Sequence, residues 1–242
     1  MFLNWSALLL EELCRKCKAP VSSSLSIKPN ANSLLLTLCP GCRQFIELNN
    51  KTVLFLNLES EPKSLLVPVI SATAYEGLAQ RLIKRLKYNE DKIIARDMGA
   101  MMFDTFESIV LKQRLVECHE SIIVTPVPLH KTKTRHRGYN QAALLALYFL
   151  KRSKIKMRSR YEELLERTKE TSPMFGLSRI ERYQNVNMAF ACRRFSPHYL
   201  SGKTIILVDD VFTSGATLKE CARTLIDCGA ESIIALTAAR SL

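Results

Sequence analysis

The hydrophobic positions of the chain fall into short runs that alternate with stretches of helical periodicity. Thr204 to Val208 is apolar and largely β-branched, which is typical of a strand buried on both faces of a parallel sheet. Ser121 to Thr125 is a second run of this kind. Apolar residues then recur at helical spacing over Asn140 to Leu150, and again from Leu218 to Ile226. The pattern predicts strands that alternate with helices, and therefore an α/β domain.

The same alternation continues on both sides of these elements. Leu65 to Ala72 has the pattern of a strand, and Tyr75 to Lys87 and Lys92 to Val116 have helical periodicity. Near the end of the chain, Glu231 to Ala238 predicts a further strand. Gly229, just before it, stands where the C-terminal cap of a helix is expected.

Before residue 65 the pattern changes to short strands only. They are predicted at 34–38, 44–48 and 51–58. The segment 59–64, ESEPKS, is polar and contains a proline, which is typical of a linker. We therefore expect a small β-rich domain over residues 1–60 and a larger α/β domain over residues 65–242.

Two C-x-x-C motifs, CRKC and CPGC, lie in the small domain. Their cysteines are Cys14, Cys17, Cys39 and Cys42. Two such turns can supply the four thiolates of a tetrahedral zinc site, which leaves no position for a catalytic water. We expect a structural zinc that folds a region too small to hold itself together. An iron site, a redox dithiol or fortuitous thiols are the alternatives.

Composition narrows the class of protein. With 47% hydrophobic and 24% charged residues among 242, the chain can form a sizeable core. No apolar run approaches the roughly 18 residues of a membrane span, and the opening stretch lacks the basic start and cleavage site of a signal peptide. The four remaining cysteines are scattered, which is most simply explained by core thiols in a reducing cytoplasm. The net charge of +12 favours anionic partners, although a basic surface also aids solubility.

The most informative run, VDDVFTSGAT, follows the strand predicted at 204–208. Asp209 and Asp210 are ionised carboxylates that can only accept hydrogen bonds, which suits the two hydroxyls of a sugar diol. The loop from Thr213 to Thr217 offers backbone N–H groups and hydroxyls at the start of a helix, and its small residues let a phosphate approach. Together they predict a ribose 5-phosphate site. Each half alone could merely cap a turn or start a helix.

Two other segments are strongly basic. The helix predicted at 75–87 carries Arg81, Lys84, Arg85 and Lys87 opposite its apolar face. A solvated basic face is the simplest interpretation, with phosphate binding as the alternative. The second segment follows Pro126-Val127-Pro128, and its basic residues are Lys131, Lys133, Arg135, His136 and Arg137. Such a cluster suits a group with several negative charges, or a DNA backbone.

These motifs resemble those of known families. The run from Val208 to Thr217 is similar, position by position, to the signature of the type I phosphoribosyltransferases, which use phosphoribosyl pyrophosphate (PRPP). Over nearly the whole chain, the sequence resembles the ComF family of competence-associated proteins, which join a four-cysteine zinc module to such a domain. Further residues that carry this resemblance are PVPL at 126–129, RGYNQA at 137–142, Leu86-Lys87-Tyr88, Glu181-Arg182, Asn185-Val186 and Phe190.

The resemblance implies a parallel sheet flanked by helices, and a role for each motif. Asp209 and Asp210 are expected to hold the ribose hydroxyls, and Thr213, Ser214, Gly215, Ala216 and Thr217 the 5-phosphate. The segment from Pro126 to Arg137 is expected to contact the pyrophosphate, through Lys131, Arg135 and Arg137, with magnesium between ribose and pyrophosphate. Residues 168–179, after a strand predicted at 164–167, could fold over the site. Pro173-Met174 replaces the Pro-Gln pair usual in the family, so no role of that glutamine carries over.

The expected function is therefore transfer of ribose 5-phosphate from PRPP to an unidentified acceptor, in a cytoplasmic protein that acts in DNA uptake. A second hypothesis is a competence factor that binds single-stranded DNA, in which the PRPP site is regulatory or vestigial. A third is a binding partner of a DNA translocase, as the cellular setting of the family suggests. None of these requires a membrane span.

Overall fold

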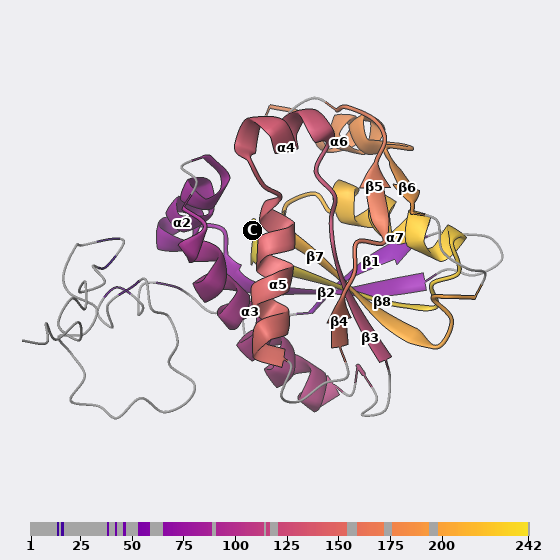
Figure 1. The fold of residues 1–242 in the computed structure, drawn as a ribbon, viewed down its shortest axis with the longest axis horizontal. Helices are drawn as coiled ribbons and strands as arrows, with labels where there is room; N and C mark the ends of the chain where they lie inside the picture. The colour runs from indigo at the N-terminus through magenta and orange to yellow at the C-terminus, as the bar shows by residue number, and fades with distance from the viewer. Residues whose placement is uncertain are drawn as a thin grey trace, which may run out of the picture.

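The structure is a computed structural model in which a six-stranded sheet lies between two layers of helices (Figure 1). The order of the strands is β1-β2-β8-β7-β3-β4. Their bounds are β1 Leu54–Leu58, β2 Leu65–Ala74, β3 Ser121–Pro126, β4 Ser159–Tyr161, β7 Lys203–Phe212 and β8 Ser232–Arg240. The structure describes residues 14, 16, 38, 42, 46, 53–58, 65–88, 91–113, 115–116, 121–153, 159–171, 176–193 and 198–241.

The sheet is parallel except at one edge. Strands β2, β8, β7, β3 and β4 pair in parallel, whereas β1 pairs with β2 in antiparallel register. The predicted parallel sheet flanked by helices is thus confirmed. The sequence assigned the strand 51–58 to the small N-terminal domain, but β1 is the edge strand of the main sheet. Its Leu56 and Leu58 are buried there because they face the core on the α7 side.

Helices cover both faces of the sheet because its strands are apolar on both faces. On one face pack α2 (Gly77–Tyr88), α3 (Ile93–Gln113) and α5 (Gln141–Ser153), and on the other packs α7 (Ala216–Asp227). The strand β7 shows how the faces alternate. Ile206 and Val208 belong to the core beneath α3 and α5, whereas Ile205 and Leu207 belong to the core beneath α7.

A small second layer covers the α7 side. Strands β5 (Leu165–Arg167) and β6 (Phe190–Cys192) form an antiparallel pair, and helix α6 (Arg179–Val186) lies beside them (Figure 1). We call β5, β6 and α6 the hood. A capping box of Ser178 and Glu181 fixes the start of α6. The hood packs against α7 through β6 and α6.

Most of the predicted elements occur within a few residues of their expected bounds, and two differ in an informative way. The basic segment at 131–137, for which no helix was predicted, is the helix α4 (Lys131–Arg137), which ends at Gly138 in the left-handed conformation, φ 73°. None of the residues of α4 is buried, so it has no apolar periodicity to reveal it. Strand β7 continues to Phe212, beyond the expected end at Val208, because its pairing with β8 persists to that point.

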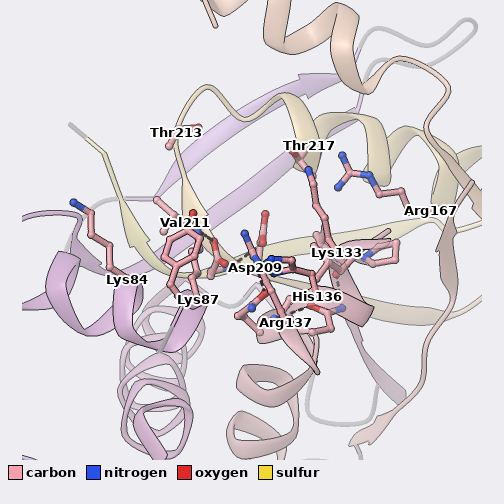
Figure 2. A pocket seen from close by; sticks show the side chains of 18 of the residues that line it. Lys84, Lys87, Lys133, His136, Arg137, Arg167, Asp209, Val211, Thr213 and Thr217 are labelled. Carbon is pink, nitrogen blue, oxygen red and sulfur yellow. Dashed lines mark hydrogen bonds and ion pairs between the residues drawn. The ribbon is translucent and has the colours of Figure 1, made fainter. Parts of the chain in front are cut away.

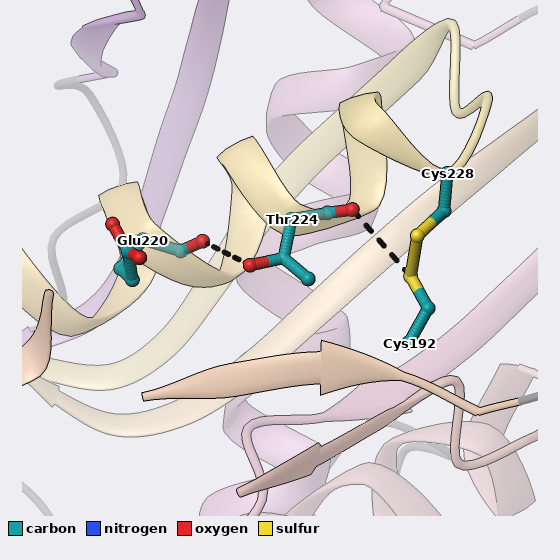
Figure 3. The surroundings of a disulfide bond; sticks show 4 residues. All are labelled: Cys192, Glu220, Thr224 and Cys228. Atoms are coloured by element: carbon teal, nitrogen blue, oxygen red, sulfur yellow. Dashed lines mark hydrogen bonds between the residues drawn. A yellow bond between two sulfur atoms is a disulfide. The ribbon is translucent and has the colours of Figure 1, made fainter. Parts of the chain in front are cut away.

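The cysteines outside the N-terminal motifs also differ from expectation in part. Cys221 is fully buried, as expected of a core thiol. Cys192 at the end of β6 and Cys228 at the end of α7 instead form a disulfide that ties the hood to that helix (Figure 3). The Sγ atom of Cys192 lies 3.4 Å from the carbonyl oxygen of Thr224. The separation of 36 residues gives no local signal for this pair.

Several predictions lie outside the described residues. They are Cys17, Cys39, Cys118, the strands at 34–38 and 44–48 apart from Leu38 and Ile46, the linker 59–64 and Pro173-Met174. Cys14 and Cys42 are buried. Among the helices of the described ranges, none is both long enough and apolar enough for a membrane crossing.

Candidate functional site

A cavity of about 770 Å³ opens where β3 stops and β7 continues (Figure 2). Pro126 at the end of β3 is paired with Val208, and the N–H of Val127 still donates to the carbonyl oxygen of Val208 over 2.8 Å. Beyond that point β7 remains paired only with β8, so its other edge is open. Asp209 and Asp210 are the first residues of this open edge. Crevices at the carboxyl ends of parallel strands are where open α/β sheets bind ligands.

The two aspartates point to opposite faces of the sheet, since successive side chains of a strand alternate. Asp210 forms a 2.8 Å ion pair with Lys87 of α2. Burial alone would lower the pKa of Lys87, but the charge of Asp210 and the hydrogen bond to it raise that pKa. The solvated role expected for Lys87 is therefore wrong, although Arg81 and Lys84 of the same helix are exposed.

Asp209 lies on the hood side of the sheet, close to the guanidinium of Arg167. Burial, and then the negative charge of Asp210, raise the pKa of Asp209 well above its ordinary value. The N–H of Asp210, 2.8 Å from Oδ1 of Asp209, and the charges of Lys87 and Arg167 oppose this shift. The ionised form of Asp209 is thus destabilised in the folded protein, and a cation or a hydrogen-bond donor in the cavity would stabilise it.

The loop after Phe212 is shaped for a small anion. Gly215 has φ 77°, in the left-handed region, and precedes the first residue of α7. A Cβ atom on Gly215 would lie 2.8 Å from Leu56 Cδ2 and 2.9 Å from Phe212 Cε2, so those side chains would have to move to admit it, and the positive φ also favours glycine. The residues from Thr213 to Thr217 line a hollow of about 30 Å³ at the N-terminus of α7. The hood supports this loop, because Tyr183 Oη donates to the carbonyl oxygen of Ser214 over 2.9 Å.

On the other side of the cavity, residues 86–88 contact residues 137–139, although the two segments are distant in sequence. Tyr139 donates its hydroxyl to the carbonyl oxygen of Leu86, and the guanidinium of Arg137 lies 5.1 Å from the ring centroid of Tyr88. Asn140 donates to the carbonyl oxygen of Val127 over 3.0 Å. These contacts fix α4, the end of β3 and the last turn of α2 around the cavity.

The cavity is strongly cationic. Its lining includes six lysine or arginine side chains against two aspartates, Asp209 and Asp210. The six are Lys84, Lys87, Lys133, Arg137, Arg167 and Arg182. Figure 2 shows Asp209 near the middle of this group, with Thr213 and Thr217 beyond it. Such an excess of positive charge suits a ligand with several negative charges.

Of the three residues expected to contact pyrophosphate, only Arg137 lines the cavity. Lys131 and Arg135 are exposed and absent from its lining. Lys133, which the sequence did not single out, takes their place, because residues four apart share one face of a helix and residues two apart do not. A helical interpretation of this segment would have grouped Lys133 with Arg137.

Sequence reasoning also gave no role to Gln141, Arg167 and Arg182. Gln141 is 2% exposed, accepts from Arg137 Nη1 over 3.2 Å, and keeps its Nε2 without a partner in the described part of the chain. The Nε atoms of Arg167 and Arg182 are buried in the same way. Gln141 and Arg182 do occur in the motifs that carry the family resemblance. Arg167 could be found only by its position in β5.

Together these elements can hold a sugar phosphate at both ends. The aspartates offer acceptors for a diol, the loop offers donors for a phosphate, and the cations beside them offer sites for further oxyanions. With the order of the strands, this site defines a domain of the phosphoribosyltransferase type. Residues 162–241 match the phosphoribosyl transferase domain family, in agreement with that class.

Comparison with individual proteins finds similarity to one group of relatives. Competence protein F of Haemophilus influenzae is 32% identical over 152 residues, 63% of this chain and 63% of that protein. Competence protein ComFC of Bacillus subtilis is 27% identical over 172 residues, 71% of this chain and 63% of that protein. These similarities, with the domain match, support the resemblance of the chain to the ComF family.

The coverage of these relatives differs. The chain matches less than two thirds of the length of the Haemophilus and Bacillus proteins. DNA utilization protein YhgH of Escherichia coli is 26% identical over 225 residues, which are 91% of this chain and 93% of that protein.

Proposed function

We propose that the chain binds PRPP with magnesium and transfers its ribose 5-phosphate to an acceptor, as a phosphoribosyltransferase. One observation carries this proposal: a single continuous segment, Asp209 to Thr217, places both carboxylates, Thr213 and Thr217 in the lining of the cavity, and the whole glycine loop around the small hollow that also includes Asp209. The cavity is also large enough for a sugar with phosphates at both ends.

Each part of PRPP has a matching group in this arrangement. The loop from Thr213 to Thr217 holds the 5-phosphate with its N–H groups and hydroxyls. Asp209 and Asp210 accept from the ribose hydroxyls and fix the ring. Arg137, with its Nη1 beside Gln141 and its ring contact to Tyr88, is preorganised for the pyrophosphate.

The proposed reaction is a displacement at the anomeric carbon. A nucleophilic N–H of the acceptor forms the new bond to that carbon and then releases its proton. The bond to the pyrophosphate oxygen breaks, and the pyrophosphate leaves with the electron pair. Positive charge develops on the ribose ring, next to Asp209 and Asp210, while negative charge develops next to Arg137. Both changes lower the barrier because the charges of the protein are already in place.

Magnesium fits the donor set of this site. Asp209 and Asp210 supply carboxylate oxygens, which are the ligands that magnesium prefers, and Asp209 is destabilised as an anion by burial and by Asp210. When bound, the metal would neutralise charge on the pyrophosphate and on the pair of acids. The chain itself then orients the ring and excludes water with the hood.

The cellular role is proposed from the relatives. Two of them are competence proteins and another is a DNA utilization protein, so we infer that this chain acts in DNA uptake or utilization in the cytoplasm. The acceptor would then be a nucleotide or a related molecule. A partnership with a DNA translocase is a further part of this proposal, and a pull-down with and without residues 1–60 tests it.

Calorimetry with PRPP and magnesium tests the proposed binding. Wild-type protein should bind, and Asp209→Asn or Asp210→Asn should remove most of the affinity. Asp227→Asn is the matched control, since Asp227 is exposed at the far end of α7 and outside the cavity. Absence of binding to the wild type, or equal binding by all three variants, would contradict the proposal.

A second function, binding of single-stranded DNA, is favoured by the outer face of α4. Lys131 and Arg135 are exposed there and lie outside the cavity lining. Tyr88, which is 69% exposed, has its ring centroid 5.1 Å from the guanidinium of Arg137 in the same helix. Cations next to an aromatic ring are a common platform for stacked bases and their phosphates.

Fluorescence anisotropy with labelled single-stranded DNA tests this function, with affinity expected to fall steeply as salt rises. Lys131→Gln should weaken binding several-fold. Lys112→Gln, an exposed lysine near the end of α3, should have no such effect. Binding that does not respond to salt, or that is lost equally in both variants, would reject the proposed surface.

Zinc remains a prediction for Cys14, Cys17, Cys39 and Cys42. We propose one zinc ion per chain, held by these four thiolates. Metal analysis of the purified protein should give that ratio, and Cys17→Ser should lower it. A full complement of zinc in Cys17→Ser would show that the metal is held elsewhere.

A further inference from the structure

Two arginines of the hood face the cavity with hydrogen-bonding capacity to spare. Arg167 of β5 and Arg182 of α6 both line it, and the Nε atom of each is buried without a hydrogen-bond partner in the described ranges. A buried N–H without an acceptor costs free energy, so such groups normally have a partner. Since the described residues offer none here, an acceptor atom on a ligand is the natural partner.

Contacts within the chain hold Arg167 in place without using all of its donors. Its guanidinium lies 5.2 Å from the ring centroid of Phe190, and its Nη2 donates to the hydroxyl of Thr171. Lys133 Nζ donates to the carbonyl oxygen of the same Thr171 over 3.1 Å. Two cations from different elements are therefore held together beside one residue (Figure 2).

The proximity of these cations, together with their burial, destabilises their charged forms. Burial, and then the positive charges of Arg167 and Arg137, lower the pKa of Lys133. Burial also lowers the pKa of Arg167. Among the described residues, Asp209 and Asp210 are the only carboxylates in the lining. Asp210 is already paired with Lys87, and the charge of Asp209 acts on Arg167, whose pKa it raises. The hood side therefore carries positive charge that the lining does not neutralise.

In the proposed function, no group of PRPP pairs with the cations on the hood side. The 5-phosphate belongs to the glycine loop, and the pyrophosphate belongs to α4, on the side of Arg137. In a direct displacement the acceptor approaches the anomeric carbon from the face opposite to the leaving group. The hood is the side that remains, and it presents Arg167 and Arg182.

We propose that Arg167 and Arg182, with Lys133, form an oxyanion subsite for the acceptor, which therefore carries a carboxylate or a phosphate group. The proposal rests on the proposed function and makes it more specific. A neutral base or nucleoside would leave these donors unpaired, whereas an anionic one would accept hydrogen bonds from them. The subsite thus selects among acceptors by charge, as a difference in binding free energy.

NMR signals of the arginine Nε–H groups test the subsite directly. The full-length protein is first saturated with PRPP and magnesium and then titrated with inorganic phosphate or, separately, with acetate. We expect saturable shifts of the Arg167 and Arg182 signals, and the better anion identifies the source as phosphate or carboxylate. Arg182→Gln should weaken the response of Arg167 by about tenfold or more.

Arg179→Gln is the matched control, because Arg179 is exposed on the same helix and lies outside the lining. It should leave both signals and the anion affinity unchanged. Thermal unfolding of both variants checks that each is folded, and Lys133→Gln provides a second variant outside the hood.

Three results would overturn the subsite. They are no saturable shift with either anion, the same affinity in Arg182→Gln as in wild type, or saturation of both arginines by PRPP alone. The last result would mean that the two arginines bind the pyrophosphate of PRPP and not the acceptor. If PRPP does not bind at all but the anions still shift both signals, the proposed transfer fails while the subsite stands.

Discussion

The sugar side of the cavity comes from one continuous segment, Asp209 to Thr217, whereas its cationic side comes from four separate elements. The continuous segment is a strand end and a helix start, so its geometry follows from local rules of strand and loop structure. The cations lie on α2, α4, β5 and α6, and only the packing of these elements brings them together. We expect substitutions on the two sides to fail in different ways. The first side should lose its shape, and the second should lose charge balance or specificity.

The largest effect is expected at Gly215, where the shape of the loop depends on one backbone conformation. Gly215→Ala should destabilise the protein by about 3 kcal/mol, since φ 77° is unfavourable for alanine and the added Cβ overlaps Leu56 and Phe212. Urea unfolding measures the loss, and PRPP binding should disappear with it.

Gly202→Ala is the control that measures the cost of a positive φ without the close packing found at Gly215. Gly202 has φ 64°, but an added Cβ would meet nothing within 4 Å. Its cost should stay near 1–2 kcal/mol, with PRPP binding intact. Equal losses for both variants would show that the close packing around Gly215 contributes nothing.

The next largest loss of stability is expected at Lys87, whose ion pair with Asp210 connects the cationic side of the cavity to the two aspartates. Lys87→Met should cost about 2 kcal/mol at neutral pH, because it leaves the largely buried carboxylate of Asp210 without its 2.8 Å partner. Lys84→Met, one turn earlier and exposed, should change stability by less than about 0.5 kcal/mol. Similar values for the two variants would mean that the ion pair is not responsible.

A smaller change in stability is expected at Asp209, where substitution should stabilise the protein. Its pKa is raised in the folded state, so between its ordinary pKa and the raised one the folded protein binds more protons than the unfolded chain. Stability from this group is therefore present at acidic pH and falls as pH rises through that window.

Asp209→Asn removes this dependence. It should stabilise the ligand-free protein by about 1 kcal/mol above the raised pKa, and have little effect below the ordinary one. Thermal unfolding across pH measures the difference. Loss of stability in Asp209→Asn at alkaline pH would contradict the raised pKa.

The smallest effect is expected at the hydrogen bond that connects the hood to the loop. Tyr183→Phe removes the donor to the carbonyl oxygen of Ser214 and should cost about 0.5–1 kcal/mol. Hydrogen exchange should also become faster in the loop. Tyr88→Phe is the control, since it keeps the ring beside Arg137 and should leave loop exchange unchanged.

The helix α4 shows why the sequence predicted the two sides unequally. The basic residues from Lys131 to Arg137 were visible in the sequence, but no apolar position showed that the segment is helical. Without the helix, the sequence selected Lys131 and Arg135 beside Arg137 and passed over Lys133. The tertiary structure separates them, because the helix turns Lys133 and Arg137 toward the cavity and leaves Lys131 and Arg135 exposed.

The sequence by itself determined the alternation of strands and helices, the glycine loop and the placement of two acids beside it. These features depend on residues that are neighbours in the chain, so periodicity and local backbone rules suffice to predict them. Only the tertiary structure decided that Lys87 pairs with Asp210, that Cys192 meets Cys228, and that Arg167 and Arg182 face the cavity. Such pairings join residues far apart in sequence, and they exist only once the sheet and its helical layers have packed.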